Sequence, residues 1–139
     1  ARLGDVLLSA TRIYVESVIS VHRAGLLKGL AHITGGGFPE NIARILPADV
    51  TAEIDAASWQ LPPVFRWLME HGEIPLGEMV STFNCGIGMI AIVAAADVTE
   101  VIQMFTEAGS PACRIGQIVA RTPQLPVGRL IGLDEAWRN

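Results

Sequence analysis

The sequence is poor in the residues that several classes of protein require. Only two of its 139 residues are cysteine, Cys85 and Cys113. Two cysteines are too few for a disulfide framework, so we expect a cytoplasmic protein with reduced thiols. There are ten Lys and Arg against fourteen Asp and Glu, the net charge is −4, and no basic run occurs. Because sequence-independent binding of nucleic acid requires a basic face, we expect no nucleic-acid partner.

Long apolar segments are absent as well. The longest apolar run, Met89 to Ala96, is far shorter than the ~20 residues of a membrane-spanning helix, so we expect no membrane partner. No signal peptide, internal repeat or low-complexity tract is visible. Half of the residues are hydrophobic and 17% are charged, which is typical of one globular domain. The sequence begins with Ala1 rather than Met, and we expect it to be either processed or a piece of something longer.

Apolar periodicity predicts helices that alternate with strands. Helices are predicted over residues 12–23, 39–46, 62–72, 76–83 and 97–109, the first of them capped by Thr11. Strands are predicted over residues 26–34, with residues 30–34 as the core of that strand, and over residues 51–54, 88–96, 113–121 and 128–133. The continuous apolar strand 88–96 is expected to be central and covered on both faces. This order predicts a layered α/β (α+β) sandwich, with residues 1–11 as a lead-in and residues 12–139 as one domain.

The first candidate site is HITGGGFPEN, residues 32–41. A strand that passes through Gly35, Gly36 and Gly37 into a helix leaves backbone N–H groups uncovered, and the helix dipole favours an anion there. The stretch is neither a Walker P-loop, since no Lys-Ser/Thr follows, nor a dinucleotide fingerprint, since the glycine spacing differs. The alternative is a tight turn that lets helix and sheet pack closely.

Polar residues flank the glycines. His32 and Thr34 have the same parity along the predicted strand, so they point to one face, where His32 would donate to a phosphate or position a substrate. The alternative is a half-buried histidine satisfied by the backbone. Asn41 lies on the opening turn of the helix, where its amide either reaches into a site or faces solvent. Glu40 is interpreted as a helix-end charge rather than a general base.

The second candidate site is TFNCGIGM, residues 82–89. Asn84 both donates and accepts hydrogen bonds, and Gly86 and Gly88 permit close approach to the backbone. No Cys-His or Cys-Asp spacing supports activation of Cys85, so we expect a buried structural thiol rather than a nucleophile. The acidic residues are scattered and no His or Cys pair has ligand spacing, so no metal ligand and no catalytic residue is assigned.

Two further features have both a functional and a structural interpretation. Arg12 stands at the start of a predicted helix, where the dipole disfavours a cation, so it either faces an anion or is a solvated surface residue. Trp59, Phe65 and Trp67 suggest a stacking platform for bases. Without surrounding Lys or Arg, we expect these aromatic residues to pack in the core instead.

Three motifs occur in order: TRIYV, HITGGGFPEN and TFNCGIGM. Together with ILPADVTAEID and IGQIVAR, they resemble the C-terminal domain of aminoimidazole ribonucleotide synthetase (phosphoribosylformylglycinamidine cyclo-ligase) over roughly residues 7–121. The resemblance implies a three-layer α/β/α sandwich around a mixed sheet, with partly ferredoxin-like topology. The substrate-binding residues that it implies are His32, Thr34, Gly35, Gly36, Gly37, Asn41, Asn84 and Gly86, with Arg12 assisting.

The resemblance also implies a reaction. ATP activates the formamide oxygen of formylglycinamidine ribonucleotide as an iminophosphate, an internal nitrogen closes the imidazole ring, and phosphate leaves. In this family an N-terminal domain carries the acidic metal ligands and most of the ATP site, and it builds a homodimer. That domain is absent from the 139 residues, so ATP and Mg²⁺ would be held mainly outside them. We therefore expect this chain alone to be inactive.

Two alternatives stay open at the level of sequence. One is the C-terminal domain of a sister ATP-dependent enzyme, such as formylglycinamidine ribonucleotide synthetase, thiamine monophosphate kinase or selenophosphate synthetase. These sisters share the sandwich but are not expected to keep all three motifs together. The other is a non-catalytic domain that binds a phosphorylated ligand.

Overall fold

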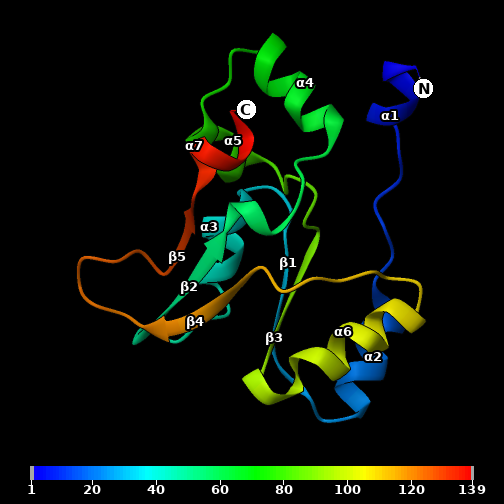
Figure 1. The fold of residues 1–139 in the computed structure, drawn as a ribbon, viewed down its shortest axis with the longest axis vertical. Helices are drawn as coiled ribbons and strands as arrows, with labels where there is room; N and C mark the ends of the chain where they lie inside the picture. Colours follow the sequence, from blue (N-terminus) through cyan, green and yellow to red (C-terminus); the bar gives the residue numbers. More distant parts are fainter. Residues whose placement is uncertain (1, 139) are drawn as a thin grey trace.

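The computed structural model describes residues 2–138, and Figure 1 shows its elements in order. The α-helices are α1 (Leu3–Leu7), α2 (Val15–Arg23), α3 (Gly37–Ala43), α4 (Pro63–His71), α5 (Leu76–Thr82), α6 (Val98–Glu107) and α7 (Leu133–Trp137). The strands are β1 (Leu27–His32), β2 (Val50–Asp55), β3 (Met89–Val93), β4 (Gly116–Ala120) and β5 (Gly128–Ile131). Two short 3-10 helices, η1 (Ala56–Ser58) and η2 (Ala95–Asp97), follow β2 and β3.

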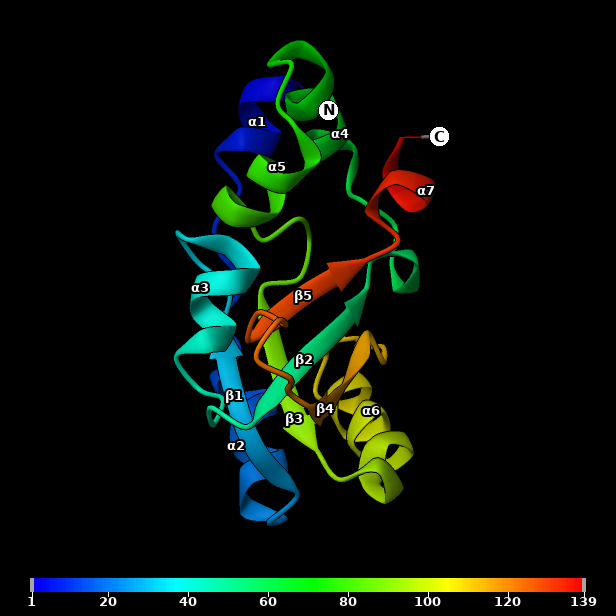
Figure 2. The ribbon, with the colours of Figure 1, turned by 90° about the vertical axis from the view of Figure 1, so that its left-hand side faces the viewer.

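The strands form two small sheets rather than one. In the first sheet β1 pairs antiparallel with β3, and in the second β2 lies between β4, antiparallel to it, and β5, parallel to it. Figure 2 shows β2 and β5 running obliquely to β1 and β3. The mixed α/β class is confirmed. The prediction of a single mixed sheet is wrong for residues 2–138.

The prediction that residues 88–96 form a central, doubly covered strand is also wrong. The strand β3 covers only Met89–Val93, pairs only with β1, and has five residues that are all half-buried. Beyond it, Ala95–Asp97 turns into the 3-10 helix η2. The continuous apolar run correctly indicated a strand. It carried no information about neighbouring strands, because central position depends on pairing partners that are distant in sequence.

Element boundaries shift by a few residues at the N-terminal motifs. Helix α2 begins at Val15 rather than at residue 12, and Tyr14 rather than Thr11 is its N-cap residue. Strand β1 ends at His32, although the backbone N–H of Ile33 still donates to the carbonyl of Gly88 at 2.8 Å. Helices α4, α5 and α6 lie within the predicted ranges, and Gly109, with φ of 73°, follows the end of α6 as expected.

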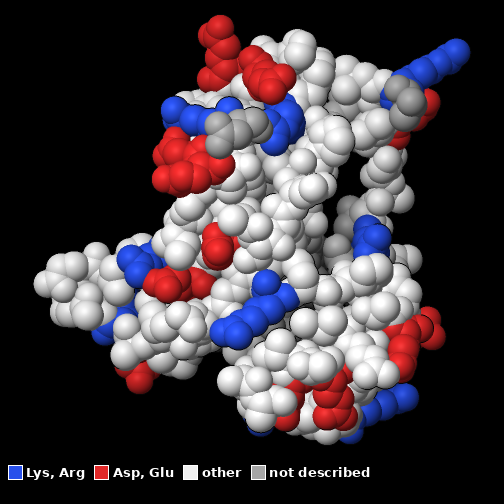
Figure 3. Space-filling model, in the orientation of Figure 1, with Lys and Arg blue, Asp and Glu red and all other residues white. Residues whose placement is uncertain are grey.

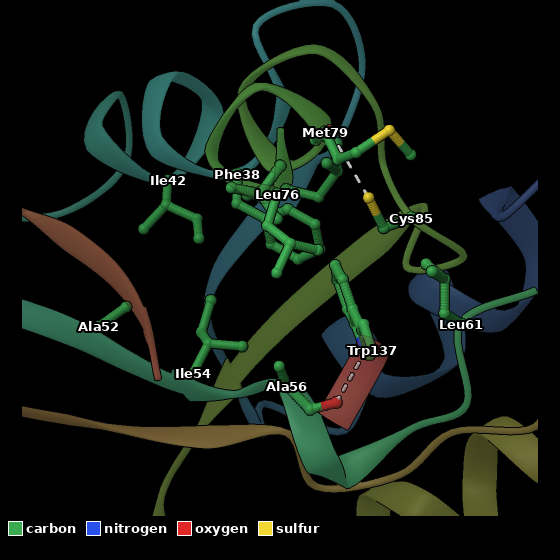
Figure 4. Close-up of a cluster of buried hydrophobic side chains, with 13 residues drawn as sticks. Phe38, Ile42, Ala52, Ile54, Ala56, Leu61, Leu76, Met79, Cys85 and Trp137 are labelled. Atoms are coloured by element: carbon green, nitrogen blue, oxygen red, sulfur yellow. Dashed lines mark hydrogen bonds between the residues drawn. The ribbon is translucent and has the colours of Figure 1, made fainter. Parts of the chain in front are cut away.

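The core lies where α3, α5, β2 and α7 meet (Figure 4). Phe38 of α3 and Met79 of α5 are fully buried, and Trp137 of α7 is 1% exposed with its indole N–H donating to the carbonyl of Ala56 at 3.2 Å. Helix α7 was not predicted, since residues 128–133 were expected to end the domain as an edge strand. A buried hydrogen-bonded tryptophan fixes this short helix in place.

The aromatic residues divide between core and surface. Trp59 packs against Phe38 and Trp137, with ring centroids 5.9 and 5.5 Å away, and Phe65 packs near Phe83. The core interpretation is therefore correct for Trp59 and Phe65. It is wrong for Trp67, which is 36% exposed on α4 and stacks on His71 one turn later. The i, i+4 spacing on a solvent-facing helix side explains that pair.

Residues 2–13 form a largely exposed lead-in to the rest of the chain. Residues 3–7 form α1 beside α4, and the chain then runs extended to α2, with Leu8 86% and Ile13 83% exposed. Figure 3 shows an opening between this segment and the rest of the molecule. Helix α2 packs against α6 at the far end of the β1–β3 pair. Across residues 2–138, no helix combines the length and the apolar character needed to span a membrane.

Candidate functional site

The three sequence motifs converge at the ends of β1 and β3. The register places His32 opposite Met89, and Ile33 donates its N–H to the carbonyl of Gly88. Tyr14, just before α2, brings the third motif to the same place, since its ring lies 6.0 Å from the His32 ring in an edge-to-face arrangement at 70°. Residues that are far apart in sequence therefore form one surface. Tyr14 was not among the candidate residues, and its position within TRIYV is the only signal that sequence offered.

Two of the three glycines in the turn, Gly36 and Gly37, have a structural reason to be glycine. Gly36 and Gly37 have φ of 91° and 58°, in the left-handed region that favours glycine. A Cβ on Gly37 would overlap the carbonyl oxygen of Val80, so α3 and α5 meet backbone to backbone here. The close-packing interpretation is therefore correct for Gly37, which is buried.

Asn41 holds this turn from inside. Its side chain is buried, and the amide nitrogen donates to the carbonyls of Gly37 at 2.8 Å, Thr34 at 3.3 Å and Gly35 at 3.3 Å. Both amide protons therefore go to backbone carbonyls, and the amide nitrogen holds the turn. Burial excludes the solvent-facing alternative, and a contact of Asn41 with substrate stays a prediction.

The outer face of the turn is exposed. His32 and Thr34 are exposed on either side of buried Ile33, which confirms that they share one face. Gly35 is exposed too, its φ lies outside the left-handed region, and no atom lies within 4 Å of a Cβ built on it. Within residues 2–138 no hydrogen bond uses the backbone N–H of Gly35 or Gly36. The carbonyls point inward to Asn41, and two N–H groups stay available.

A carboxylate borders the turn. Glu40 lies so close to Gly36 that a Cβ there would overlap its side chain, and it forms an ion pair with Arg44 one turn later. Negative charge at this helix end agrees with the helix-end interpretation of Glu40. Because like charges repel, an anion is disfavoured at Gly36 and has better access at Gly35 and His32.

The second turn is held by its own asparagine. The Asn84 side-chain oxygen accepts the N–H of Gly86 at 3.0 Å, Cys85 adopts φ of 48°, and Gly86 adopts φ of 97°. The indole N–H of Trp59 donates to the carbonyl of Cys85 at 2.9 Å. A Cβ on Gly86 would lie 2.6 Å from Cγ of Pro62, so this glycine also has a packing reason.

The thiol inside this turn is sealed from solvent. Cys85 is fully buried, and burial raises the pKa of its thiol from the ordinary value of 9.0 to about 12. Burial disfavours the charged thiolate, which is the reactive form. The structure supports the expectation of a structural thiol.

A cavity of about 570 Å³ opens between the two sheets and α6. Its walls are largely apolar and come from β3, α6 and residues 110–118, while Arg12, Tyr14, Gly86 and Gly88 line its rim on the motif side. Arg12 lies before α2 in extended chain rather than on the helix, which removes the dipole argument. The cavity thus brings Arg12 and Gly86 together, whereas His32, Thr34, Asn41 and Asn84 lie outside its lining.

The description "AIR synthase related protein, C-terminal domain" is that of a family model that matches residues 1–126. The chain belongs to this family. It is 46% identical over 119 residues, 86% of its length, to the phosphoribosylformylglycinamidine cyclo-ligase of Chromobacterium violaceum. It is 44% identical over 138 residues, 99% of its length, to the bifunctional purine biosynthetic protein ADE1 of Schizosaccharomyces pombe. These matches cover 34% and 17% of the two relatives, so the chain spans about a third or less of either.

Within residues 2–138 no group of three or more His, Cys, Asp or Glu side chains could hold a metal ion. The most organised charges lie on the three-stranded sheet, where Glu53 pairs with Arg129 of β5 and bonds to Gln117 of β4. The Arg129 hydrogen bond lowers the pKa of Glu53, which fits a structural ladder across the strands.

Proposed function

We propose that this chain is the C-terminal part of a phosphoribosylformylglycinamidine cyclo-ligase. Such an enzyme uses ATP to close the imidazole ring of formylglycinamidine ribonucleotide, and it gives 5-aminoimidazole ribonucleotide, ADP and phosphate in de novo purine biosynthesis. The identity of 46% over most of the chain to a named cyclo-ligase carries the proposal. Within it, this domain helps to bind the ribonucleotide, and ATP and Mg²⁺ are held mainly by polypeptide outside the matched region.

The substrate phosphate is assigned to the outer face of the glycine turn. Gly35 carries the assignment, because neither its backbone conformation nor its surroundings require glycine. A glycine without a structural reason fits a backbone that a ligand approaches closely. The N–H group of Gly35, away from the Glu40 carboxylate, is available as a donor, and the side chains of His32 and Thr34 lie exposed beside it.

The other candidate residues either shape the two glycine turns or border the neighbouring cavity. Asn41 and Asn84 shape the two turns by binding backbone groups, and Gly37 permits the α3–α5 contact. Arg12 and Gly86 border the cavity next to Tyr14, where they would meet the part of the substrate that extends from its phosphate. Binding and orientation are the contributions required, since internal ring closure needs two groups of one molecule held together and no protein nucleophile.

No step at this domain is assigned to a metal, since its described residues do not fit one. The homodimer and the cytoplasmic location stay predictions about the whole enzyme. The same holds for the partly ferredoxin-like three-layer sandwich, for which the alternation of strands and helices along the chain, β1–α3–β2 and β3–α6–β4, is the support.

A hybrid enzyme tests the activity. Residues 1–139 replace the matching third of the Chromobacterium violaceum cyclo-ligase, and formation of 5-aminoimidazole ribonucleotide and ADP is measured with formylglycinamidine ribonucleotide and ATP. We expect turnover by the hybrid and none by the isolated chain. A folded hybrid without turnover, or with turnover only on a different ATP-dependent substrate, would reject the cyclo-ligase assignment. Turnover by the isolated chain would reject the division of labour.

Two glycine substitutions test the phosphate assignment in the hybrid. Gly35→Ala should raise KM for the ribonucleotide about tenfold, because a methyl group blocks close approach of the phosphate, while the melting temperature stays unchanged. Gly77→Ala is the matched control, since Gly77 is exposed on α5 and also has nothing within 4 Å of an added Cβ. Equal KM values for both variants would remove Gly35 from the site.

A further inference from the structure

We propose that Tyr14 is a positioning residue that orients the imidazole of His32 toward the substrate. This inference rests on the proposed function, in which His32 contacts the ribonucleotide. It assigns to Tyr14 a role that sequence reasoning did not, and it explains why TRIYV accompanies the two glycine motifs.

The backbone of Tyr14 is fixed at the start of α2. Its carbonyl accepts the N–H of Val18 at 3.0 Å and the hydroxyl of Ser17 at 3.0 Å, and Ser17 is buried. With two acceptor contacts and the N-cap position, the residue cannot follow the extended chain that precedes it. The direction of its side chain is therefore set by the helix.

Gly88 makes room for the phenol ring. The φ of Gly88 lies outside the left-handed region, so no backbone strain requires glycine there. A Cβ on Gly88 would instead overlap the Tyr14 hydroxyl and lie 3.0 Å from its Cζ. Because Gly88 is also tied to β1 through the Ile33 hydrogen bond, the ring rests on the junction of the two strands. The three atoms nearest to an added Cβ all belong to Tyr14.

The ring of His32 depends on Tyr14 for its orientation. His32 ends β1 and is exposed, and within residues 2–138 no hydrogen bond or ion pair holds its imidazole. Its contact is the edge-to-face arrangement with Tyr14 at 6.0 Å and 70°. Such aromatic pairs are favourable and select one geometry of the two rings. An exposed histidine that is already oriented loses less side-chain entropy when a ligand binds.

The direct test measures the histidine ring in the 139-residue chain. The ring of Tyr14 should shift the NMR signals of the His32 ring protons, and Tyr14→Leu should remove that shift while Tyr14→Phe retains it. Gly88→Ala, which pushes the phenol aside, should act like Tyr14→Leu. Unchanged His32 signals in both Tyr14→Leu and Gly88→Ala, with melting temperatures near that of the parent, would overturn the positioning role.

Kinetics of the hybrid separate this inference from the proposed function. His32→Ala and Tyr14→Leu should each raise KM about tenfold, and the double variant should be no worse than His32→Ala, because Tyr14 acts through His32. Tyr14→Phe should restore the parent KM. If His32→Ala alone has no effect, the role proposed for His32 fails. If His32→Ala raises KM and Tyr14→Leu does not, the positioning role alone fails.

Discussion

The two glycine turns use the same residue types in opposite ways. In the first turn, buried Asn41 donates to the backbone carbonyls of Thr34, Gly35 and Gly37. In the second turn, half-buried Asn84 accepts a backbone N–H, that of Gly86. An asparagine that binds carbonyls leaves donors facing outward, and one that binds an N–H uses up a donor. The comparison therefore points to the first turn as the place for an anion and to the second as a support.

Gly37→Ala should break the first turn most severely. The new methyl group would meet the carbonyl of Val80 while the backbone stays at φ of 58°, so we expect a loss of about 3–4 kcal/mol of unfolding free energy. Denaturant unfolding followed by circular dichroism measures it. Gly35→Ala is the matched control and should change stability by less than about 0.5 kcal/mol. Equal losses at the two glycines would contradict the difference drawn between them.

Asn41→Ala should have the next largest effect. Removing the amide takes a hydrogen bond from three carbonyls, of which that of Thr34 still accepts the backbone N–H of Gly37, and we expect a loss of about 2–3 kcal/mol. The same unfolding measurement applies. Asn41→Asp is a useful comparison, because a carboxylate of the same shape cannot donate to these carbonyls at neutral pH and should not restore stability. Full stability of the aspartate variant would show that the amide hydrogen bonds do not hold the turn.

Alkaline pH should loosen the second turn through Cys85. Its pKa is raised to about 12 in the folded chain, so the unfolded chain loses its thiol proton first, near 9.0. The contribution of the protonated Cys85 thiol to the free energy of unfolding is fully present below pH 9. It falls as pH rises toward 12, by about 1 kcal/mol at pH 10. Cys85→Ala cannot titrate, so its stability should decline less between pH 8 and pH 10. Parallel declines in the two proteins would show that the thiol is not responsible.

Asn84→Ala should be the mildest change. One hydrogen bond in a half-exposed turn is lost, and water can replace the missing acceptor, so we expect about 0.5–1 kcal/mol. The loss of unfolding free energy in Asn84→Ala and in Asn41→Ala, measured under the same conditions, compares the two turns most directly. If Asn84→Ala destabilises the chain as much as Asn41→Ala, the two turns are equally dependent on their asparagines.

Several elements were predictable because their signals are local. Helix α6 follows from an apolar stripe with Asp97 before it and Gly109 after it, and α4 follows from its proline start and Gly72. The shared face of His32 and Thr34 follows from strand alternation alone. The convergence of the motifs was predicted in outline, because the resemblance assigns residues of all three motifs to one substrate site.

The errors concern relations between distant residues. Among residues 2–138, strand β3 pairs with β1 alone, and α7 is held by a contact between Trp137 and Ala56. At shorter range, Asn41 turns its amide inward to three carbonyls. In each case the local sequence permits more than one arrangement. Asn41, for example, has the same helix-end position whether its amide faces a ligand or the backbone. Only the neighbours that folding brings together select one arrangement.

By itself the sequence determined the alternation of helices and strands, the positions of the two glycine turns and the family, since each depends on residue order. Tertiary structure decided how the strands divide into two sheets, which glycine serves packing and which stays open, and which ring meets His32. Gly37 and Gly35 illustrate the reason. They are two residues apart and chemically identical, yet one lies against the backbone of Val80 and the other against nothing within 4 Å.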